Sequence, residues 1–282
     1  MRYVLGVRIG PVTFRIGSDW QGPIAQLRTL YRDYPRDDGV PDFSVRLTPR
    51  RPWRRWIRPA VMIEGDFVIP DAAPLPLDQG VLAAEMGMNL QMALGQRRFL
   101  LLHAAAVERN GRAIVLTGES GAGKSTLAAL LQTRGWRLMA DEFVLLDPAS
   151  GLVHPFPRPV SLKNSAIDVV AEELTGAHWG PLMRDTPKGA IRHLVPAADA
   201  LAAAERPARP VLLLFPRFGL PADQRGVGAG EAFVRLTQAS TNYVVLGERG
   251  FTALTRFVGD VTRVAIDYPD ADAAAAMIEK LW

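Results

Sequence analysis

Residues 118–125 read GESGAGKS, and this stretch decides the fold. The apolar run 113–117 before it predicts a strand, and Leu127, Leu130 and Leu131 after it fall at helical spacing. A strand, a glycine-rich turn ending in Gly-Lys-Ser and a helix together form a phosphate-binding loop (P-loop). Its glycine residues let backbone N–H groups turn toward phosphate oxygens, and the start of the helix adds a positive dipole. The sequence therefore predicts an α/β nucleotide-binding domain around this loop.

The P-loop predicts ATP as the ligand, together with Mg²⁺. Lys124 is expected to reach the terminal phosphates, and Ser125 is expected to bind the metal ion. Thr126 stands where a dinucleotide-binding fingerprint would need its third glycine, which excludes that class of site. The predicted nucleotide-binding residues are Gly118, Glu119, Ser120, Gly121, Ala122, Gly123, Lys124, Ser125 and Thr126.

An acidic pair, Asp141 and Glu142, follows the P-loop helix, which is expected to end at Gly135. The segment 136–146 is predicted to be one strand, so that the two side chains point to opposite faces and only one faces the P-loop. An acid in this place can hold Mg²⁺ or accept the proton of an attacking hydroxyl. The predicted metal ligands are therefore Ser125 and one of the two acids, Asp141 or Glu142.

The composition excludes several classes of protein. The chain of 282 residues has no cysteine, which excludes a disulfide scaffold, a thiolate zinc site and a cysteine nucleophile. The N-terminus lacks the apolar core of a signal peptide, and no run is long enough to span a membrane, so we expect a cytoplasmic protein. Arginine supplies almost all of the positive charge, so the net charge of +4 does not indicate a nucleic-acid partner. Against that background, a lysine marks a place where a compact charge is wanted, and the lysines are Lys124, Lys163, Lys188 and Lys280.

The proline-rich segment 69–76 predicts a boundary between an N-terminal α/β region, residues 1–77, and a nucleotide-binding catalytic domain, residues 78–282. A helix is expected to begin near Asp78 and to end at Gly95, with Leu82, Met86, Leu90 and Leu94 on its apolar face. An apolar strand is expected at 99–107. Further strands are predicted on both sides of Gly10–Pro11 and at 43–47, 211–215 and 263–268, a loop at 216–231, and helices at 24–34, 197–205, 251–258 and 271–281.

A basic segment with two tryptophans, RLTPRRPWRRWIRP at 46–59, admits two interpretations. It could bind an acidic partner through arginine charges and aromatic rings. Alternatively it is a structural hairpin in which Trp53 and Trp56 pack inward. We favour the second interpretation.

Several motifs together resemble the kinase domain of HPr kinase/phosphorylase, which is related to phosphoenolpyruvate carboxykinase. They are His103 in an apolar strand, the P-loop, Arg134-Gly135 at the end of its helix and Ala140-Asp141-Glu142. HPFPRPVSLKN at 154–164 and TPKGAIRHL at 186–194 resemble the bacterial HPr-kinase-related kinases of type A, over most of the chain. The chain departs from the classical enzyme at Thr126, where that enzyme has an acid, and it lacks the later signature of the phosphorylase reaction. We therefore do not expect phosphorolysis, nor HPr as the substrate.

The resemblance implies a kinase that phosphorylates a hydroxyl, expected to be a serine of a small protein or peptide. It assigns the proton-accepting role to Asp141 and the metal-proximal role to Glu142, with exchange of the two roles left open, and it places His103 beside the reacting phosphate. Arg158, Lys163 and Lys188 are the candidate phosphate or substrate clamps. The alternatives are a small-molecule kinase and a non-catalytic ATP-sensing subunit, and the sequence leaves a homo-oligomer open.

Overall fold

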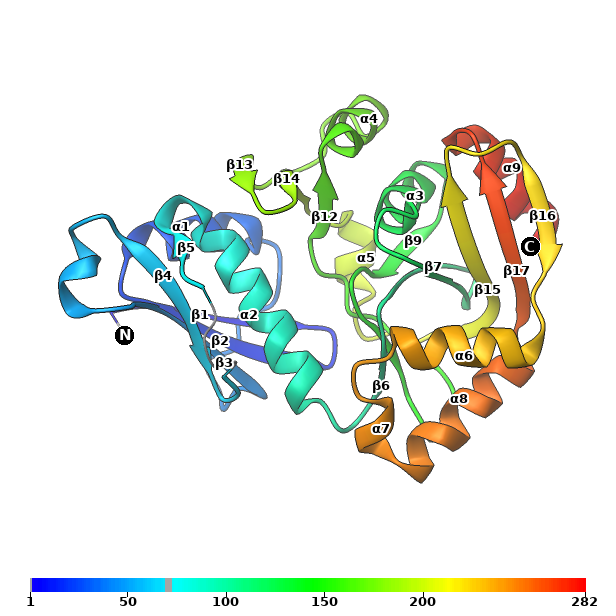
Figure 1. The fold of residues 1–282 in the computed structure, drawn as a ribbon, viewed down its shortest axis with the longest axis horizontal. Coiled ribbons are helices and arrows are strands. Elements are labelled where there is room, and N and C mark those ends of the chain that lie inside the picture. Colours follow the sequence, from blue (N-terminus) through cyan, green and yellow to red (C-terminus); the bar gives the residue numbers. More distant parts are fainter. Residues whose placement is uncertain (1, 69–72) are drawn as a thin grey trace.

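The protein has an α/β fold in which an N-terminal sheet region and a larger P-loop region lie side by side (Figure 1). A computed structural model describes residues 2–68 and 73–282. The proline-rich segment that predicted the domain boundary falls partly on residues 69–72, outside the described residues. No helix in the described part of the chain combines the length and the apolar character that a membrane crossing requires.

The N-terminal region is a five-stranded sheet in the order β1-β2-β3-β4-β5. As predicted, β1 and β2 form a hairpin around Gly10 and Pro11, and Gly10 turns the chain with a φ of +52°. Helix α1 (Gln21–Leu30), which begins and ends a few residues before the predicted helix 24–34, packs on the sheet through Ile24, Leu27 and Leu30. The strands are β1 (Tyr3–Ile9), β2 (Val12–Ser18), β3 (Phe43–Pro49), β4 (Ala60–Gly65) and β5 (Leu75–Pro76), with the short helix η1 (Pro52–Arg55) between β3 and β4.

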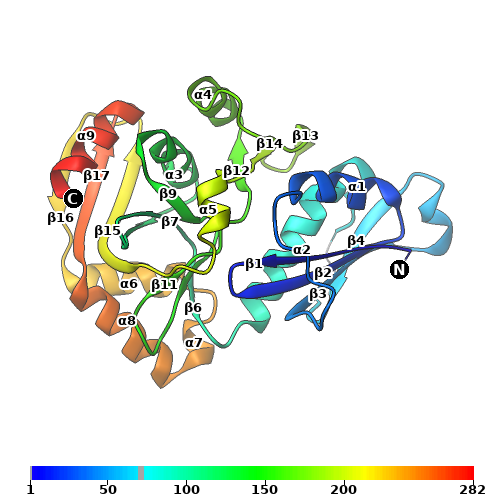
Figure 2. The same cartoon turned by 180° about the vertical axis from the view of Figure 1, so that it is seen from behind.

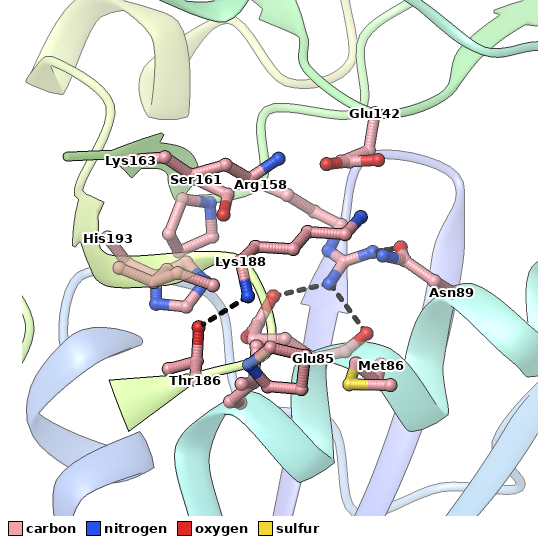
Figure 3. A pocket seen from close by; sticks show the side chains of 14 residues that line it. Glu85, Met86, Asn89, Glu142, Arg158, Ser161, Lys163, Thr186, Lys188 and His193 are labelled. Carbon is pink, nitrogen blue, oxygen red and sulfur yellow. Dashed lines mark hydrogen bonds and ion pairs between the residues drawn. The ribbon is translucent and has the colours of Figure 1, made fainter. Parts of the chain in front are cut away.

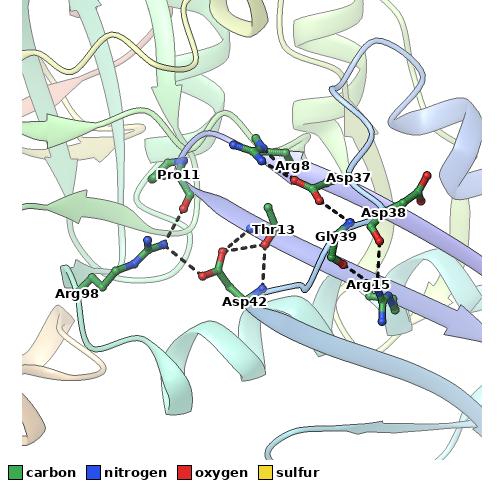
Figure 4. A network of polar contacts seen from close by, with 9 residues as sticks. All are labelled: Arg8, Pro11, Thr13, Arg15, Asp37, Asp38, Gly39, Asp42 and Arg98. Atoms are coloured by element: carbon green, nitrogen blue, oxygen red, sulfur yellow. Dashed lines mark hydrogen bonds and ion pairs between the residues drawn. The ribbon is translucent and has the colours of Figure 1, made fainter.

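A polar network fixes the loop between α1 and β3 and joins it to the next part of the chain (Figure 4). Asp42 accepts hydrogen bonds from the backbone nitrogen and the hydroxyl of Thr13, at 2.8 and 2.9 Å. Arg98 lies 3.6 Å from Asp42 and donates to the carbonyl oxygen of Pro11 at 2.6 Å. The segment that leaves the N-terminal region is thus held against its first hairpin.

Helix α2 (Gly80–Gly95) packs against β3 and β4, which places it with the N-terminal sheet, although the sequence assigned it to the following domain. A Cβ on Gly87 would lie 2.6 Å from Cγ1 of Val45, so this glycine permits the close approach. The predicted apolar face of α2 is wrong, because Met86 and Leu94 are exposed. The helix is apolar on several sides, and its buried residues include Val81, Ala84, Glu85, Met88, Gln91 and Met92.

The P-loop region is built on a six-stranded sheet in the order β16-β17-β15-β8-β7-β9. Strands β8, β15 and β17 run parallel, and the other three pair antiparallel with their neighbours. Helices α3 and α9 cover one face, and α6 and α8 cover the other (Figures 1 and 2). The elements are β7 (Ala104–Arg109), β8 (Arg112–Thr117), α3 (Lys124–Leu131), β9 (Arg137–Ala140), β15 (Arg209–Phe218), β16 (Asp223–Gly226), α6 (Ala229–Ala239), α8 (Glu248–Asp260), β17 (Thr262–Tyr268) and α9 (Ala271–Leu281).

Two smaller sheets, in the orders β11-β10-β6 and β12-β14-β13, complete this region. The predicted strand 99–107 is in fact two strands, β6 and β7, and the predicted strand 136–146 is also two, β9 and β10. The predicted loop 216–231 was also wrong in part, because it contains β16 and the start of α6. The remaining elements are η2 (Leu77–Gln79), β6 (Leu100–Leu102), η3 (Gln132–Arg134), β10 (Val144–Leu146), β11 (Val153–His154), β12 (Val160–Lys163), α4 (Ser165–Glu173), β13 (Met183–Thr186), β14 (Gly189–Leu194), α5 (Ala198–Ala202) and α7 (Tyr243–Leu246).

Candidate functional site

The P-loop connects β8 to α3 with the geometry that its glycines allow. Gly121 and Gly123 have φ angles of +88° and +89°, a region that other residues rarely adopt. A Cβ on Gly123 would lie 2.5 Å from the hydroxyl oxygen of Tyr268, at the end of β17. The loop therefore needs glycine at position 123 for its backbone angle and for the close approach of β17.

Lys124 is folded back onto the loop that precedes it. Its ammonium group donates to the carbonyl oxygens of Gly118 and Glu119 at 2.7 and 2.9 Å. The side chain is buried, and this burial lowers the pKa of Lys124 from its usual value, while the charge of Asp141 opposes the shift. The ammonium group is thus held at the mouth of the P-loop, where phosphates would lie.

Asp141 faces the P-loop, directly after the end of β9. The hydroxyl of Ser125 donates to Oδ1 of Asp141 at 2.8 Å. Asp141 is only 2% exposed, and its Oδ2 has no hydrogen-bond partner in the described structure. Burial, and next the charge of Glu142, raise the pKa of Asp141 to about 6. A buried carboxylate oxygen without a partner, beside a serine hydroxyl, fits Mg²⁺, which takes oxygen ligands and few of them from the protein.

Glu142 and His103 face each other at the point where two neighbouring segments of the chain pass from one sheet to another. Strands β7 and β9 pair in the six-stranded sheet, whereas β6 and β10 pair in a separate one, so both chains change sheet at this point. His103 lies between β6 and β7, and Glu142 lies between β9 and β10 with a φ of +69°. Oε2 of Glu142 is 3.6 Å from Nε2 of His103. The His103 side chain is 53% exposed, and its partial burial lowers the pKa of the imidazole against the opposing charge of Glu142, which favours the neutral form at pH 7.

A cavity of about 190 Å³ opens beside Glu142, where α2 of the N-terminal region faces the P-loop region (Figure 3). Helix α2 supplies one wall, and the β12-β14-β13 sheet supplies the other. The lining residues are Leu82, Glu85, Met86, Asn89, Glu142, Arg158, Pro159, Ser161, Lys163, Thr186, Pro187, Lys188, Ile191 and His193.

The cavity brings together the three predicted clamps, but it holds one of them differently from the other two. Lys163 and Lys188 form no ion pair with any described residue. Arg158 is 3% exposed, and its guanidinium is bound by Glu85 and Asn89 of α2. Its position therefore does not favour a role as a phosphate clamp, and its contacts join the two regions instead.

Sequence reasoning missed Glu85, Asn89 and His193 as lining residues. Glu85 also accepts a 2.6 Å hydrogen bond from the hydroxyl of Tyr31, so it is held from two sides. One signal was present, because a glutamate in the otherwise apolar stretch 80–88 must have a partner if it is buried.

The basic segment 46–59 lies far from the cavity, around η1 at the end of the N-terminal sheet (Figure 1). Trp53 is 50% exposed and Trp56 is 73% exposed. The interpretation that both tryptophans pack inward is therefore wrong. The segment is held at Arg55, whose carbonyl oxygen accepts from the indole nitrogen of Trp20 at 2.9 Å and whose guanidinium donates to the carbonyl oxygen of Asp19 at 2.6 Å.

Two comparisons relate the chain to known proteins. Residues 80–171, from α2 to α4, match the family model described as SynChlorMet cassette protein ScmC. That match contains the P-loop and both acids. The chain is also 36% identical, over 103 residues, to the cytochrome c biogenesis ATP-binding export protein CcmA of Rhizobium meliloti (strain 1021), which covers 34% of this chain and 46% of that protein. The chain thus spans less than half the length of this relative.

Proposed function

We propose that this chain binds ATP and Mg²⁺ and transfers the terminal phosphoryl group to a hydroxyl, as a kinase of the HPr kinase and phosphoenolpyruvate carboxykinase type. One observation carries the proposal: the side chains of the two adjacent acids face different parts of the site. Asp141 contacts Ser125 of the P-loop, whereas Glu142 lines a separate cavity. A phosphoryl donor and a phosphoryl acceptor can therefore meet between them.

The relative from Rhizobium meliloti supports nucleotide binding, since ATP binding is part of its name. That match also makes ATP hydrolysis the second candidate function. An enzyme that only hydrolyses ATP needs to position a water molecule. It has no need of a cavity built from a second region of the chain, so the α2 wall favours transfer to an acceptor.

The geometry supports the exchange of the two acid roles that the resemblance left open. Asp141, with Ser125, is placed to hold Mg²⁺, which when bound would neutralise charge on the phosphates. In this proposal the oxygen of the acceptor hydroxyl attacks the terminal phosphorus of ATP, and the bond from that phosphorus to the leaving ADP oxygen breaks. Glu142 accepts the proton that the hydroxyl loses. Nε2 of His103 lies 3.6 Å from Oε2 of Glu142, so a neutral imidazole could donate to this carboxylate after a small shift. Lys124 stabilises the charge on the transferred group.

The cavity limits the acceptor to a small group. Cavities for drug-sized ligands span roughly 300 to 1,000 Å³, and this one is about 190 Å³. It fits one side chain or a small molecule, so a serine of a small protein or peptide and a small metabolite both remain within the proposal. A cytoplasmic location, where ATP is abundant, belongs to the same proposal.

A transfer assay with ATP labelled at its terminal phosphate tests the function. The acceptors are the products of neighbouring genes and a panel of hydroxyl-bearing small molecules. We expect a labelled acceptor, and we expect Lys124→Ala to lower transfer on the order of a hundredfold or more, because catalysis of this kind rests on electrostatic positioning. Lys280→Ala, an exposed lysine in α9, is the matched control. Label released only as inorganic phosphate would favour the hydrolase. Bound ATP without any turnover would favour the non-catalytic sensor.

A further inference from the structure

The side chains that line the cavity carry a net positive charge. Glu85 and Arg158 form an ion pair and neutralise each other. His193, the one histidine among the lining residues, is buried, and this burial lowers the pKa of its imidazole and favours the neutral form at pH 7. Glu142 then stands alone against Lys163 and Lys188, neither of which has an acidic partner in the described parts of the chain. Figure 3 shows both ammonium groups pointing toward the side of the cavity where Glu142 and Arg158 lie.

Buried polar atoms of the lining also lack partners. Nδ1 of His193 and Nε of Arg158 make no hydrogen bond with the described groups, and the two residues are only 2% and 3% exposed. Buried polar atoms are almost always hydrogen-bonded. Both atoms have less than 1 Å² of accessible surface, so they lie behind the cavity wall, and the charged groups that a ligand in the cavity can reach include the ammonium groups of Lys163 and Lys188.

The turn that carries Lys188 is held in place by hydrogen bonds. The hydroxyl of Thr186 donates to the carbonyl oxygen of Gly189 at 2.6 Å and accepts from the backbone nitrogen of Lys188 at 3.2 Å. The amide of Asn164, next to Lys163, donates to the carbonyl oxygen of Lys188 at 3.4 Å. Asn164 thus couples the end of β12 to the turn, so the two lysines are positioned as a pair.

We propose that Lys163 and Lys188 bind an oxyanion, a carboxylate or a phosphate, on the phosphoryl acceptor, and that this contact places the acceptor hydroxyl beside Glu142. The inference rests on the proposed function and gives it a substrate class, the small hydroxylated anions. Uncharged alcohols would leave the lysines without a partner, so the site selects against them.

Chemical labelling of lysine tests this binding directly, because the chain has only four lysines. The full chain is treated with a limiting amine acylating reagent, and each lysine is quantified by mass spectrometry. The probes are glycerate, glycerol 3-phosphate and glycerol, so that the anion changes while a hydroxyl is kept. We expect glycerate or glycerol 3-phosphate to protect Lys163 and Lys188 severalfold, and the stronger of the two identifies the oxyanion. Lys280 should be unaffected, and glycerol should protect neither cavity lysine.

Two variants complete the test by titration calorimetry. Lys163→Met/Lys188→Met should lower the affinity for the protecting anion at least tenfold and leave the affinity for ADP unchanged. Gly189→Ala should weaken anion binding while keeping both lysines, because its Cβ would lie 2.2 Å from Oδ1 of Asn164 and would displace the turn.

Protection by neither anion would overturn the proposal. A double variant that loses affinity for ADP instead would also overturn it, since the lysines would then bind the nucleotide. Protection in a chain that transfers no phosphate would leave the anion site standing and remove the proposed function.

Discussion

The hydroxyl of Ser125 donates a 2.8 Å hydrogen bond to Oδ1 of Asp141, which connects the first turn of the P-loop helix to the end of β9. This contact orients Asp141 toward the nucleotide side. It leaves the next residue, Glu142, to face the cavity. Two neighbouring carboxylates are thereby given different surroundings, and their substitution should have different effects.

Asp141→Asn should stabilise the metal-free protein at neutral pH. Burial, and next the charge of Glu142, raise the pKa of Asp141 from 3.8 to about 6, so the folded chain keeps a proton that the unfolded chain loses. The stability contributed by Asp141 is therefore present at low pH and is lost as pH rises from about 4 to about 6. The asparagine side chain does not titrate, so the variant avoids this loss. Its free energy of unfolding at pH 7 should be higher by up to about 3 kcal/mol. Urea unfolding at pH 5 and pH 7 without Mg²⁺ measures it, with the exposed Asp168→Asn as control. Equal pH slopes in both variants would contradict the raised pKa.

The two acids should also separate in kinetics. Asp141→Asn should raise the Mg²⁺ concentration needed for transfer, because it removes a negative oxygen from the metal side. Glu142→Gln should leave the Mg²⁺ requirement unchanged and lower transfer about a hundredfold or more, because the proton acceptor is lost. Initial rates across a Mg²⁺ titration measure both effects. The opposite pattern would support the first assignment, with Asp141 as the base and Glu142 nearer the metal.

Gly123→Ala should abolish nucleotide binding. The φ of +89° strains any other residue by about 1–2 kcal/mol, and the new Cβ would lie 2.5 Å from the Tyr268 hydroxyl. Gly121→Ala is the matched control, because its φ of +88° carries the same strain with no atom within 4 Å of a Cβ. Adding Tyr268→Phe to Gly123→Ala removes the clashing oxygen and should restore part of the binding. Fluorescent ADP titrations compare the variants, and equal losses at both glycines would show that the approach of β17 is unimportant.

Glu85→Gln should destabilise the protein by about 3 kcal/mol or more, because it leaves the buried guanidinium of Arg158 without its charge partner. Glu231→Gln is the matched control, since Glu231 pairs with Arg235 at the surface, where both side chains are about 40% exposed. Such a pair contributes at most about 1 kcal/mol. Chemical unfolding measures both variants. A small effect at Glu85 would mean that the ion pair does not join the two regions energetically.

The basic segment should tolerate loss of its tryptophans. Because Trp53 and Trp56 are at least half exposed, each alanine variant should change the free energy of unfolding by less than about 1 kcal/mol. Trp136→Ala is the contrast, since Trp136 is 2% exposed and packs against Trp282. This variant should lower the free energy of unfolding by about 3–5 kcal/mol.

A second experiment tests the basic segment for an acidic partner by replacing Arg50, Arg51, Arg54 and Arg55 with serine. A loss of acceptor affinity that depends on salt, with ATP affinity unchanged, would establish one.

The sequence predicted the P-loop and its flanking elements well, because glycine angles and helical spacing are local properties. It also predicted that Asp141 and Glu142 would face different ways, although the reason was wrong. The expected alternation along one strand does not occur, since β9 ends at Ala140 and Glu142 adopts a positive φ. The change of sheet at this point depends on β6 and β10 pairing apart from β7 and β9, which no local pattern reveals.

Contacts across long sequence distances were equally hidden. Arg158 looked like a free cation because its partners Glu85 and Asn89 lie about seventy residues earlier. The tryptophans of the basic segment were expected inside because large aromatic residues usually lie there. Whether a side chain is covered depends on the tertiary surroundings, and none of the four residues of η1 is buried in the described structure.

The wall that α2 contributes has a consequence for how such proteins diversify. The groups placed to handle nucleotide lie after residue 100, whereas Glu85, Met86 and Asn89 come from the preceding helix. A chimera that joins one N-terminal half to another P-loop half should inherit its chemistry from one parent and its choice of acceptor largely from the other. Exchange of the first hundred residues would then be a short evolutionary route to a new target, provided that the glutamate facing Arg158 is kept.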